Sequence, residues 1–384
     1  MRINIASPGR FHVMDLAREL TKYGHEVNFY SYVPTRRAVK FGLPKECNHS
    51  FLWIMAPFLF LMRFFPSLKR RILPISCKVQ DYITGWFMKP CDVCVVMSET
   101  FVYAAKVAKR RGAIVFIERG SKHGVARRRI MDEIEVLKGN KPYHQKAYER
   151  ENREEKGYVY ADYIAIPADH VLQSFKEVGF PTKKLFINPY GVDVSLFKPT
   201  ILDRNDTYDV LMVGGWSYRK GCDLLGKVCI DMRLRLLHVG GLVDCPFPNS
   251  PYLTHVNSVD QTKLPKYYAK GKVFCLPSRE EGLAMVQIQA LASGLPIVCS
   301  KDSGGREFWN YMPEKKWVIE MTEFTEECLK MCIMKALELA DAQPQGQPRT
   351  YCGDTLQHLT WEAYGRRYNA KIVEVAKKKK NNEK

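Results

Sequence analysis

The stretch PSREEGLAMVQIQALASGLP, residues 277–296, places a polar turn between an apolar run ending at Leu276 and a helix-forming segment. A strand that passes through a turn into a helix is the repeating unit of α/β proteins, which bind ligands at such junctions. Gly282 lets a ligand approach the backbone, and the free N–H groups at the start of the following helix favour a phosphate. The stretch predicts an anion site with Glu281 at its rim, although an ordinary crossover with a polar turn fits the same pattern.

A second stretch, VGGWSYRKGCDLL at residues 213–225, also leads from an apolar strand into a helix. Arg219 and Lys220 stand immediately before that helix. Arginine offers a planar fork of donors and lysine a compact charge, a combination that suits a diphosphate leaving group. Glycines surround the pair, at Gly214, Gly215 and Gly221. Glycine-flanked cations at a strand end favour an anion site over a solvated surface pair.

Apolar strands and helical stretches alternate along the chain in two series. The first series has predicted strands at 2–6, 25–30, 93–97, 113–117, 163–166 and 185–187, and the second at 210–213, 235–239, 255–257, 273–276 and 296–299. Predicted helices include 13–23, 101–110 and 143–160. The alternation predicts parallel sheets, and 384 residues suit two Rossmann-like domains, each with its own core. The polar stretch 198–209 is the expected linker between them.

The charge of the chain is strongly positive and unevenly distributed. The formal net charge is +18, and residues 1–150 hold 27 Lys and Arg against 12 Asp and Glu. Such a domain attracts anions, which include nucleic acid, anionic lipid headgroups and a phosphorylated acceptor, and charge alone leaves all three open. The lysine run at 377–380 is interpreted as a solvated helix end in preference to a contact with a membrane or nucleic acid.

The most apolar and aromatic stretch is FLWIMAPFLFLMRFFP at residues 51–66, followed by Lys69, Arg70 and Arg71. It is too short and too interrupted by proline to span a bilayer, but aromatic residues beside a basic cluster suit the headgroup layer of an anionic membrane. We therefore expect residues 51–71 to contact such a membrane; a buried helix and loop of the first domain is the alternative. The chain start lacks a secretory signal pattern, so the expected location is cytoplasmic, peripheral at the inner face of the membrane.

Several motifs are absent from the sequence. There is no Asp-x-Asp pair to hold a divalent metal on a nucleotide, no GxxxxGK[ST] loop, and no GxGxxG in the first turn after a strand. These absences argue against a nucleotide hydrolase or a nicotinamide dehydrogenase, and no metal and no cofactor are predicted. Cys91 and Cys94 have the spacing of a redox or zinc pair but lie in an apolar strand without a second pair. They and most of the 12 cysteines are predicted to be reduced core thiols.

Together, the two opening stretches resemble the donor-binding domain of family 4 glycosyltransferases, which have the GT-B fold. The resemblance covers nearly the whole chain and includes three more elements, ADYIAIP at 161–167, NPYGVDVSLFKP at 188–199 and SGGRE at 303–307. In the first domain, SPGRFH at 7–12 and ERGSKH at 118–123 resemble a bacterial branch of the family that builds cell-surface polysaccharides.

The resemblance implies an α/β protein with two Rossmann-like domains that face each other across a cleft. Residues 1–195 would form an N-terminal acceptor-binding domain and residues 196–365 a C-terminal nucleotide-sugar-binding domain. Residues 366–384 would form a C-terminal helix and basic tail that can cross back to the N-terminal domain.

The resemblance also assigns a donor site to the second domain. Arg219 and Lys220 would hold the donor diphosphate, and the backbone from Gly282 to Met285 would meet the distal phosphate. Gln289 stands where the family has a glutamate that grips the ribose hydroxyls; its amide can still bind a ribose, but without a charge-assisted hydrogen bond. The predicted donor-binding residues are Gly214, Gly215, Arg219, Lys220, Ser278, Gly282, Leu283, Ala284, Met285 and Gln289.

Two residues are assigned to catalysis. Glu281 would hydrogen-bond the hydroxyls of the transferred sugar, and His123 matches a histidine that often faces that sugar, although a histidine on a polar loop is otherwise a solvated side chain. His238 lies within a predicted strand and is interpreted as a core or cleft-lining residue. Three residues of the first turn are predicted to face the acceptor and the cleft: Gly9, Arg10 and His12.

The predicted function is metal-independent transfer of a sugar from a UDP- or GDP-linked donor to a glycan or lipid-linked acceptor, with retention of configuration implied by the resemblance alone. Gln289 motivates an alternative, a catalytically silent GT-B scaffold that binds a nucleotide sugar or a partner. A basic nucleic-acid binder is permitted by the charge, but no recognised motif supports it, so no nucleic-acid partner is predicted.

Overall fold

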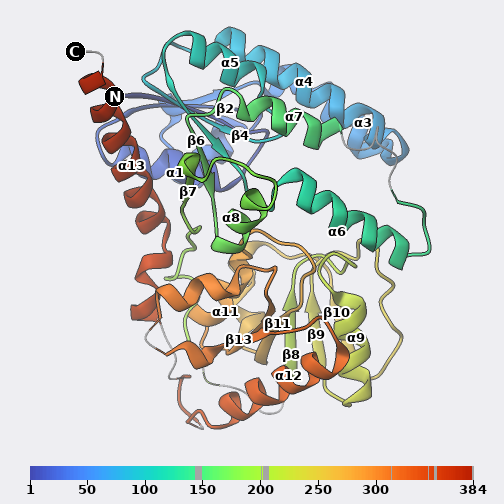
Figure 1. Cartoon of the computed structure of the whole chain (residues 1–384). Helices are drawn as coiled ribbons and strands as arrows, with labels where there is room; N and C mark the ends of the chain where they lie inside the picture. The colour runs from blue at the N-terminus through green and yellow to red at the C-terminus, as the bar shows by residue number, and fades with distance from the viewer. Residues whose placement is uncertain are drawn as a thin grey trace.

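The computed structural model describes residues 1–382 except 143–148, 200, 202–206, 313, 345 and 350–352. In that part of the chain, two parallel β-sheets form the cores of two domains, one above the other in Figure 1. Much of the predicted linker 198–209 and the start of the predicted helix 143–160 lie outside the described residues.

The first domain is built on a seven-stranded sheet in the order β3-β2-β1-β4-β5-β6-β7. Its strands are β1 (Arg2–Ala6), β2 (Glu26–Ser31), β3 (Asn48–Ser50), β4 (Val93–Met97), β5 (Ile114–Glu118), β6 (Tyr163–Ile166) and β7 (Leu185–Ile187). Strand β1 lies between two parallel neighbours, with Ile5 opposite Phe29 on one side and Val95 on the other. All three side chains are fully buried, as expected for a sheet that is covered on both faces.

The second domain is built on a six-stranded sheet in the order β10-β9-β8-β11-β12-β13. Its strands are β8 (Tyr208–Val213), β9 (Leu236–Val239), β10 (Leu253–Val256), β11 (Gly271–Leu276), β12 (Ile297–Ser300) and β13 (Val318–Met321). The strand order reverses between β8 and β11, which pair directly. Doubly wound sheets bind ligands at this reversal point, outside the carboxyl ends of the strands.

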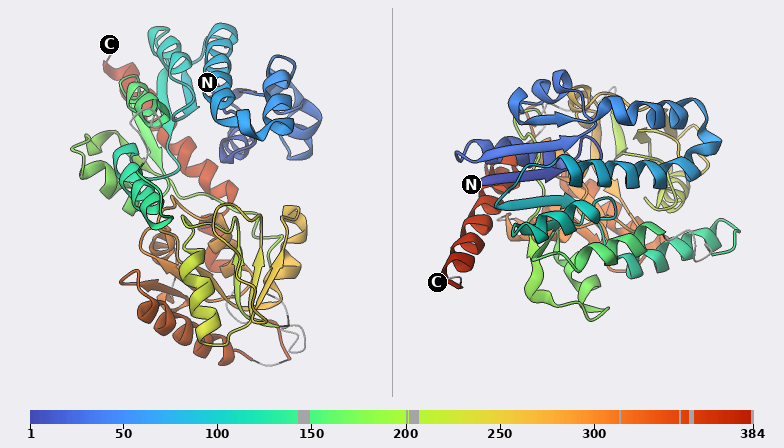
Figure 2. Two further views of the ribbon diagram at one scale, coloured as in Figure 1. Left: turned by 90° about the vertical axis from the view of Figure 1, so that its right-hand side faces the viewer. Right: turned by 90° about the horizontal axis from the view of Figure 1, so that it is seen from above.

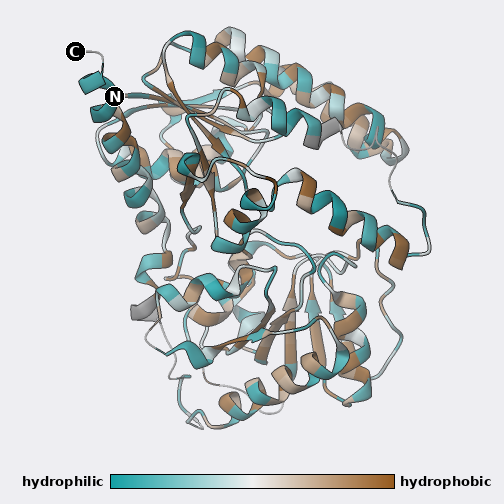
Figure 3. Cartoon of the chain, in the orientation of Figure 1, coloured by the Kyte–Doolittle hydropathy of each residue, from teal (hydrophilic) through white to brown (hydrophobic). Residues whose placement is uncertain are grey.

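Helices cover the two sheets, as the two views in Figure 2 show. Those of the first domain are α1 (His12–Thr21), α2 (Thr35–Lys40), α3 (Leu52–Phe64), α4 (Lys69–Phe87), α5 (Tyr103–Arg110), α6 (Gly124–Leu137), α7 (Glu149–Tyr158) and α8 (Asp169–Lys176). Those of the second are α9 (Cys222–Asp231), α10 (Pro265–Tyr268), α11 (Met285–Ala292) and α12 (Glu326–Asp341). In Figure 3 the strands of the second sheet are mostly hydrophobic, so this sheet forms the core of its domain.

The C-terminal helix α13 (Trp361–Asn382) leaves the second domain and packs along the first (Figure 1). The side chain of Arg367 donates a hydrogen bond of 2.7 Å to Oδ1 of Asn188, which follows β7. A Cβ atom on Gly365 would lie 2.4 Å from Cβ of Glu19, so the missing side chain lets α13 approach α1 closely. The helix begins before residue 366, where the sequence analysis placed its start.

All the predicted strands are confirmed, with ends displaced by a residue or two. The edge strands β3 and β13 were missed; β3 consists of the polar residues Asn48, His49 and Ser50 and therefore shows no apolar run. The expectation that proline interrupts the apolar stretch is confirmed at Pro66, where α3 has ended and the chain bends by 114° into the next helix. Pro57 and Pro74, in contrast, lie inside α3 and α4. A proline removes one backbone hydrogen bond from a helix, and in both places the remaining turns keep the helical path.

Two expectations about the chain as a whole can be compared with the described residues. All the cysteines described are free and most are buried, as predicted. No single helix in the described part of the chain is long and apolar enough to cross a membrane. The segments Leu52–Phe64 and Pro66–Phe87 reach the required length and hydropathy only together, and they are bent by 114°.

Candidate active site between the two domains

The turns after β8 and β11 bring three predicted site residues together. Nζ of Lys220 forms an ion pair with Oε2 of Glu281. Nη1 of Arg219 lies 3.3 Å from the same carboxylate oxygen and donates a hydrogen bond of 2.7 Å to the backbone carbonyl of Glu280. Because β8 and β11 are neighbours in a parallel sheet, their carboxyl ends place these turns side by side.

This cluster keeps its charges. Burial alone would raise the pKa of Glu281, but the positive charges of Lys220 and Arg219 outweigh burial and lower that pKa below its ordinary value. Burial likewise opposes the charge on Arg219, and the carboxylates of Glu281 and Glu280 more than compensate, so the pKa of Arg219 is raised. Two cations and a carboxylate therefore stand ionised in a partly buried site, an arrangement suited to exchange of the carboxylate for another anion.

Two glycines allow the turns to meet each other and the first domain. A Cβ atom on Gly221, which has a φ of +70°, would lie 2.0 Å from the carbonyl oxygen of Pro277. A Cβ atom on Gly282 would lie 1.8 Å from the carbonyl oxygen of Gly120, in the loop after β5. Any side chain at these positions would separate the two turns, or the two domains, so Gly221 and Gly282 are required by close backbone contact.

The remaining predicted donor residues lie around these turns, most of them buried, with Gly214 and Gly215 partly buried and Met285 exposed. The carbonyl oxygen of Gly214 accepts a hydrogen bond of 2.8 Å from Nε2 of His238, which confirms that His238 is a core residue of β9. Leu283 and Ala284 are buried immediately before α11, whose first residue is Met285. The three other positions keep their predicted place at strand ends: Gly215 after β8, and Ser278 and Gly282 after β11. The hydroxyl of Ser278 is fully buried.

A cavity between the domains joins the predicted acceptor side to the predicted donor side. It measures about 230 Å³, and its wall includes Arg10 and His12 of the first domain and Met285 and Gln289 of the second. Gly9 precedes them in the turn after β1. Nε2 of His12 lies 2.9 Å from a carboxylate oxygen of Glu118, at the end of β5.

Gln289 is buried at the wall of this cavity. Its carbonyl oxygen accepts a hydrogen bond of 3.0 Å from the hydroxyl of Tyr268. That contact fixes the orientation of the amide and leaves its NH₂ group as the part available to a ligand. A buried amide also needs no counter-ion, whereas a buried carboxylate would.

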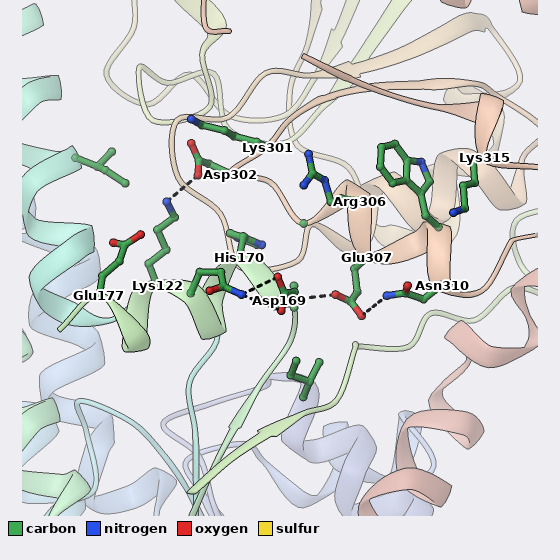
Figure 4. A pocket seen from close by; sticks show the side chains of 16 residues that line it. Lys122, Asp169, His170, Glu177, Lys301, Asp302, Arg306, Glu307, Asn310 and Lys315 are labelled. Carbon is green, nitrogen blue, oxygen red and sulfur yellow. Dashed lines mark hydrogen bonds and ion pairs between the residues drawn. The ribbon is translucent and has the colours of Figure 1, made fainter. Parts of the chain in front are cut away.

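A groove of about 830 Å³ lies on the other side of the Glu281 turn, between α8 and the 301–310 segment (Figure 4). Polar contacts between the domains form its walls. Nζ of Lys122 bonds Oδ1 of Asp302 at 2.7 Å, and Nε2 of His170 lies 2.8 Å from the carbonyl oxygen of Glu281. The backbone N–H of Asp169 donates to the carboxylate of Glu307 at 3.1 Å. These contacts hold the turn that carries Glu281 against the first domain.

His123 does not join the cluster, which corrects its predicted position on the cleft surface. It caps the start of α6, and Nδ1 accepts a hydrogen bond of 3.3 Å from the backbone N–H of Val125. Its ring is buried against the aromatic rings of Phe175 and Tyr158. The neighbouring residues Gly120 and Lys122 make the contacts of this loop with the second domain.

The structure also places residues at the site that the sequence analysis did not assign: Glu118, Lys122, His170 and Tyr190. Glu118 and Lys122 belong to the 118–123 motif, and a carboxylate at the carboxyl end of a strand was a usable signal. His170 carries no pattern that distinguishes it from any other helix residue.

Among the described residues, no group of three or more His, Cys, Asp or Glu side chains is placed to hold a metal ion.

Burial of His123 makes the fold sensitive to acid. Burial, with the positive charges of Arg119 and Arg128, lowers the pKa of His123 to about 4 from an ordinary value of 6.5. The unfolded chain therefore takes up a proton at this residue below pH 6.5, and the folded chain does so only near pH 4, so its stability falls as the pH falls through that window. Since a difference of one in pKa is worth about 1.4 kcal/mol, the loss is roughly 2–3 kcal/mol.

Denaturant unfolding at pH 7 and pH 4.5 measures this loss. Asparagine at position 123 can still cap the helix but cannot titrate, so His123→Asn should lose roughly 2–3 kcal/mol less than the wild type between the two pH values. His358→Asn, at an exposed position, provides the control for a change from histidine to asparagine. Equal losses in the wild type and His123→Asn would contradict the buried, neutral state of this ring.

Comparison with known proteins gives matches in both sequence and structure. Residues 207–332, most of the second domain, match the model of a family described as glycosyl transferases group 1. An uncharacterized glycosyltransferase from Haemophilus influenzae is 34% identical to the chain over 79 residues, 21% of each protein. The matched segment thus spans about a fifth of the length of that curated relative.

Solved structures match the whole architecture. Sucrose-phosphate synthase from Thermosynechococcus elongatus superposes with a TM-score of 0.63 at 14% identity, covering 98% of this chain and 99% of that one. Anabaena HepE, solved in complex with UDP and glucose, superposes with a TM-score of 0.60 at 11% identity, covering 97% of this chain and 100% of that one. The chain therefore has the GT-B fold, with two parallel-sheet α/β domains of seven and six strands.

Proposed function

We propose that the chain is a glycosyltransferase that moves a sugar from a nucleoside diphosphate donor to an acceptor between the two domains. The observation that carries this proposal is the ionised cluster of Arg219, Lys220 and Glu281. It lies at the reversal point of the second sheet, inside the segment that matches the glycosyl transferases group 1 model. Cations held at this point are available to a diphosphate, and a carboxylate beside them is available to sugar hydroxyls.

The residues of the cluster have different roles in the transfer. The donor diphosphate exchanges with the Glu281 carboxylate as partner of Arg219 and Lys220, which then stabilise the charge that grows on the leaving group. Glu281 is released to bind the hydroxyls of the transferred sugar. The N–H groups at the start of α11 add the positive end of a helix toward the distal phosphate. The NH₂ group of Gln289 is left for the ribose.

The sequence resemblance supports three narrower proposals. We propose that the chain belongs to glycosyltransferase family 4 and that it transfers the sugar without a metal ion and with retention of configuration. We also propose that its acceptor is a glycan or a lipid-linked acceptor of cell-surface polysaccharide synthesis. UDP-linked donors are tested before GDP-linked ones, because the structure of Anabaena HepE was solved with UDP-glucose.

A thermal-shift screen against UDP, GDP and their sugars tests donor binding, since a ligand that binds only the folded chain stabilises it. We expect one nucleotide series to raise the melting temperature. Turnover with the bound donor then separates an enzyme from a silent scaffold, which would bind the nucleotide sugar without releasing nucleoside diphosphate. A chain that is stabilised by no nucleotide, and shifts only nucleic acid in a salt-sensitive gel assay, would contradict the proposal.

We also propose that the α3–α4 hairpin holds the protein on an anionic membrane, at the inner face of the cytoplasmic membrane. The structure contradicts the alternative of a buried helix, because Met55 is the only fully buried residue of α3. Large apolar side chains are exposed instead: Trp53, Ile54, Phe60, Leu61, Phe64, Phe65, Leu68, Ile75, Tyr82, Trp86 and Phe87. Trp53 is 87% exposed, and Arg63 and Lys69 to Arg71 supply positive charge beside this surface. Apolar rings beside cations suit an anionic headgroup layer.

Flotation with phosphatidylglycerol vesicles tests this surface. Replacing Trp53 and Phe64 by serine removes two exposed rings, and burial of an aromatic side chain is worth about 1.5–3 kcal/mol, so binding should fall by at least tenfold. Thermal unfolding should not change, because neither ring packs in the core. A matched control is Met331→Ser with Met334→Ser on α12 of the second domain, which are also exposed. Equal flotation of both double variants and the wild type would contradict membrane contact through the hairpin.

A further inference from the structure

A tyrosine hydroxyl lies where the two domains come closest together. Tyr190 follows β7, at the start of the segment through which the chain passes into the second domain, and only 6% of its surface is exposed. Its hydroxyl oxygen has no hydrogen-bond partner among the described residues. The same oxygen lies 2.9 Å from the position that a Cβ atom on Gly120 would take, and the carbonyl oxygen of Gly120 lies against Gly282 of the second domain. The hydroxyl is therefore beside the contact between the first domain and the turn that carries Glu281.

Neighbouring residues hold the ring of Tyr190 in this position. The imidazole ring of His12 lies against it, with the ring centroids 4.3 Å apart, and the ring of Tyr364 meets it edge-on at 6.1 Å. The backbone beside it is tied to α13, because Nη2 of Arg367 donates a hydrogen bond of 2.7 Å to the carbonyl oxygen of Pro189. A ring packed in this way cannot turn its hydroxyl toward another part of the fold, so water or a ligand must supply an acceptor.

The charges around the hydroxyl determine which acceptor it can bind. Burial, together with the negative charges of Glu118 and Glu281, raises the pKa of Tyr190 well above its ordinary value of 10, although Arg119 opposes this effect. The hydroxyl therefore keeps its proton and acts as a donor. A phosphate oxygen placed here would meet two carboxylates, and like charges placed close together in an interface are unfavourable. A neutral oxygen avoids this cost, and sugars supply such oxygens as hydroxyl groups and ring oxygens.

Buried polar atoms without a partner also occur on the second-domain side of the interface. In the turn after β11, Oγ of Ser278 and Oε1 of Glu280 are buried, and neither has a hydrogen-bond partner in the described part of the chain. The turn faces the first domain, since Oε2 of Glu280 lies 3.8 Å from Nε of Arg127 on α6. Buried polar groups in folded proteins are nearly all paired, so unpaired groups on both sides of one interface point to a polar ligand that binds between them.

We propose that the hydroxyl of Tyr190 binds the sugar of the donor and donates a hydrogen bond to one of its neutral oxygens, an inference that rests on the proposed glycosyltransferase function. The sugar is then held from both domains, by Glu281 of the second and by Tyr190 of the first. Because Gly120 and Gly282 are in contact, the domains separate for the donor to enter and close again on the sugar. A donor that supplies an acceptor to Tyr190 favours the closed arrangement, whereas a nucleoside diphosphate without a sugar does not.

The substitution Tyr190→Phe tests the proposal, because it removes one oxygen atom and keeps the ring. Isothermal titration calorimetry measures Kd for UDP-glucose and for UDP, or for whichever donor and matching nucleoside diphosphate stabilise the chain most. Loss of one neutral hydrogen bond should raise Kd for the donor about three- to tenfold. Kd for the nucleoside diphosphate, which has no sugar, should equal that of the wild type.

The stability of the ligand-free variant shows whether the hydroxyl has a structural role. The melting temperature of Tyr190→Phe should equal or exceed that of the wild type, because the fold loses no hydrogen bond and a buried unpaired donor is removed. Tyr208→Phe is the matched control, since Tyr208 begins β8 and lies at the opposite end of that strand from the donor turn. It should leave both Kd values unchanged.

The outcomes separate this inference from the function on which it rests. If the wild type binds the donor and Tyr190→Phe binds it with equal affinity, the role of Tyr190 alone is overturned. An equal loss of affinity for donor and nucleoside diphosphate would place the hydroxyl at the diphosphate, and a lower melting temperature of the ligand-free variant would show a structural hydrogen bond. Either result would also overturn the inference. If the wild type binds neither ligand, the proposed function fails together with this inference.

Discussion

Alanine at both Arg219 and Lys220 should weaken the binding of UDP by more than a hundredfold. Each cation makes a charge-assisted hydrogen bond to the diphosphate, worth about 1.5–3 kcal/mol, and two such losses exceed the 2.7 kcal/mol or so of a hundredfold change. The proposal assigns no metal ion to the diphosphate, and the N–H groups at the start of α11 carry only a partial positive charge, which does not replace two cations. Isothermal titration calorimetry of the wild type and the double variant measures the change directly.

A lysine outside the site gives the matched control. Lys227 lies on α9 of the same domain, is largely exposed and pairs with Glu326. Lys227→Ala should therefore bind UDP as the wild type does, because exposed ion pairs contribute little and this one lies away from the turns. Unchanged affinity in the double variant would remove Arg219 and Lys220 from the donor site.

Alanine at Glu281 should separate transfer from donor binding. Loss of the contact to the transferred sugar should lower the transfer rate by at least about 10²–10³, the cost of removing one preorganised polar group at a reacting centre. The affinity for UDP, which carries no sugar, should stay equal or become tighter, because Glu281 no longer competes with the diphosphate for Lys220 and Arg219. Calorimetry and a transfer assay on the same preparation measure the two effects.

The opposite pattern would contradict this division of roles. If Glu281→Ala weakens UDP binding and leaves the rate with saturating donor unchanged, Glu281 organises the turn and does not act on the sugar. Glu326→Ala is the control for loss of a carboxylate in this domain, since Glu326 lies at the start of α12 and, among the described residues, pairs with Lys227. It should change neither quantity.

Periodicity and turn chemistry were enough to predict the sheets and the turns that carry Arg219, Lys220 and Glu281. Strand β11 ends in an apolar run directly before Pro277, and β1 ends just before the turn at Pro8, so their ends were set within a residue or two. Arg219 and Glu281 are 62 residues apart in the sequence. Their meeting follows from the strand order of a doubly wound sheet, in which the turns after the first and fourth strands are neighbours.

The parts that sequence reasoning missed depend on packing. His123 was expected to face the transferred sugar because it matches a histidine of the family, but its ring packs against Phe175 and Tyr158, residues distant in the sequence. The pairing of His12 with Glu118 joins the start of α1 to the end of β5, and no local sequence pattern indicates it. The sequence also left undecided whether α3 is exposed or buried, because an apolar helix has the same composition on a membrane surface as in a core.

The proposed function requires that the wild-type chain transfers a sugar. Incubation with the donor that stabilises it most and a membrane extract, followed by mass spectrometry of the acceptor and a measurement of nucleoside diphosphate, tests that claim most directly. We expect one nucleoside diphosphate released for each sugar added, and neither product from the Arg219→Ala and Lys220→Ala double variant. A wild-type chain that binds the donor but transfers no sugar and releases no nucleoside diphosphate would contradict the account and would establish the silent scaffold instead.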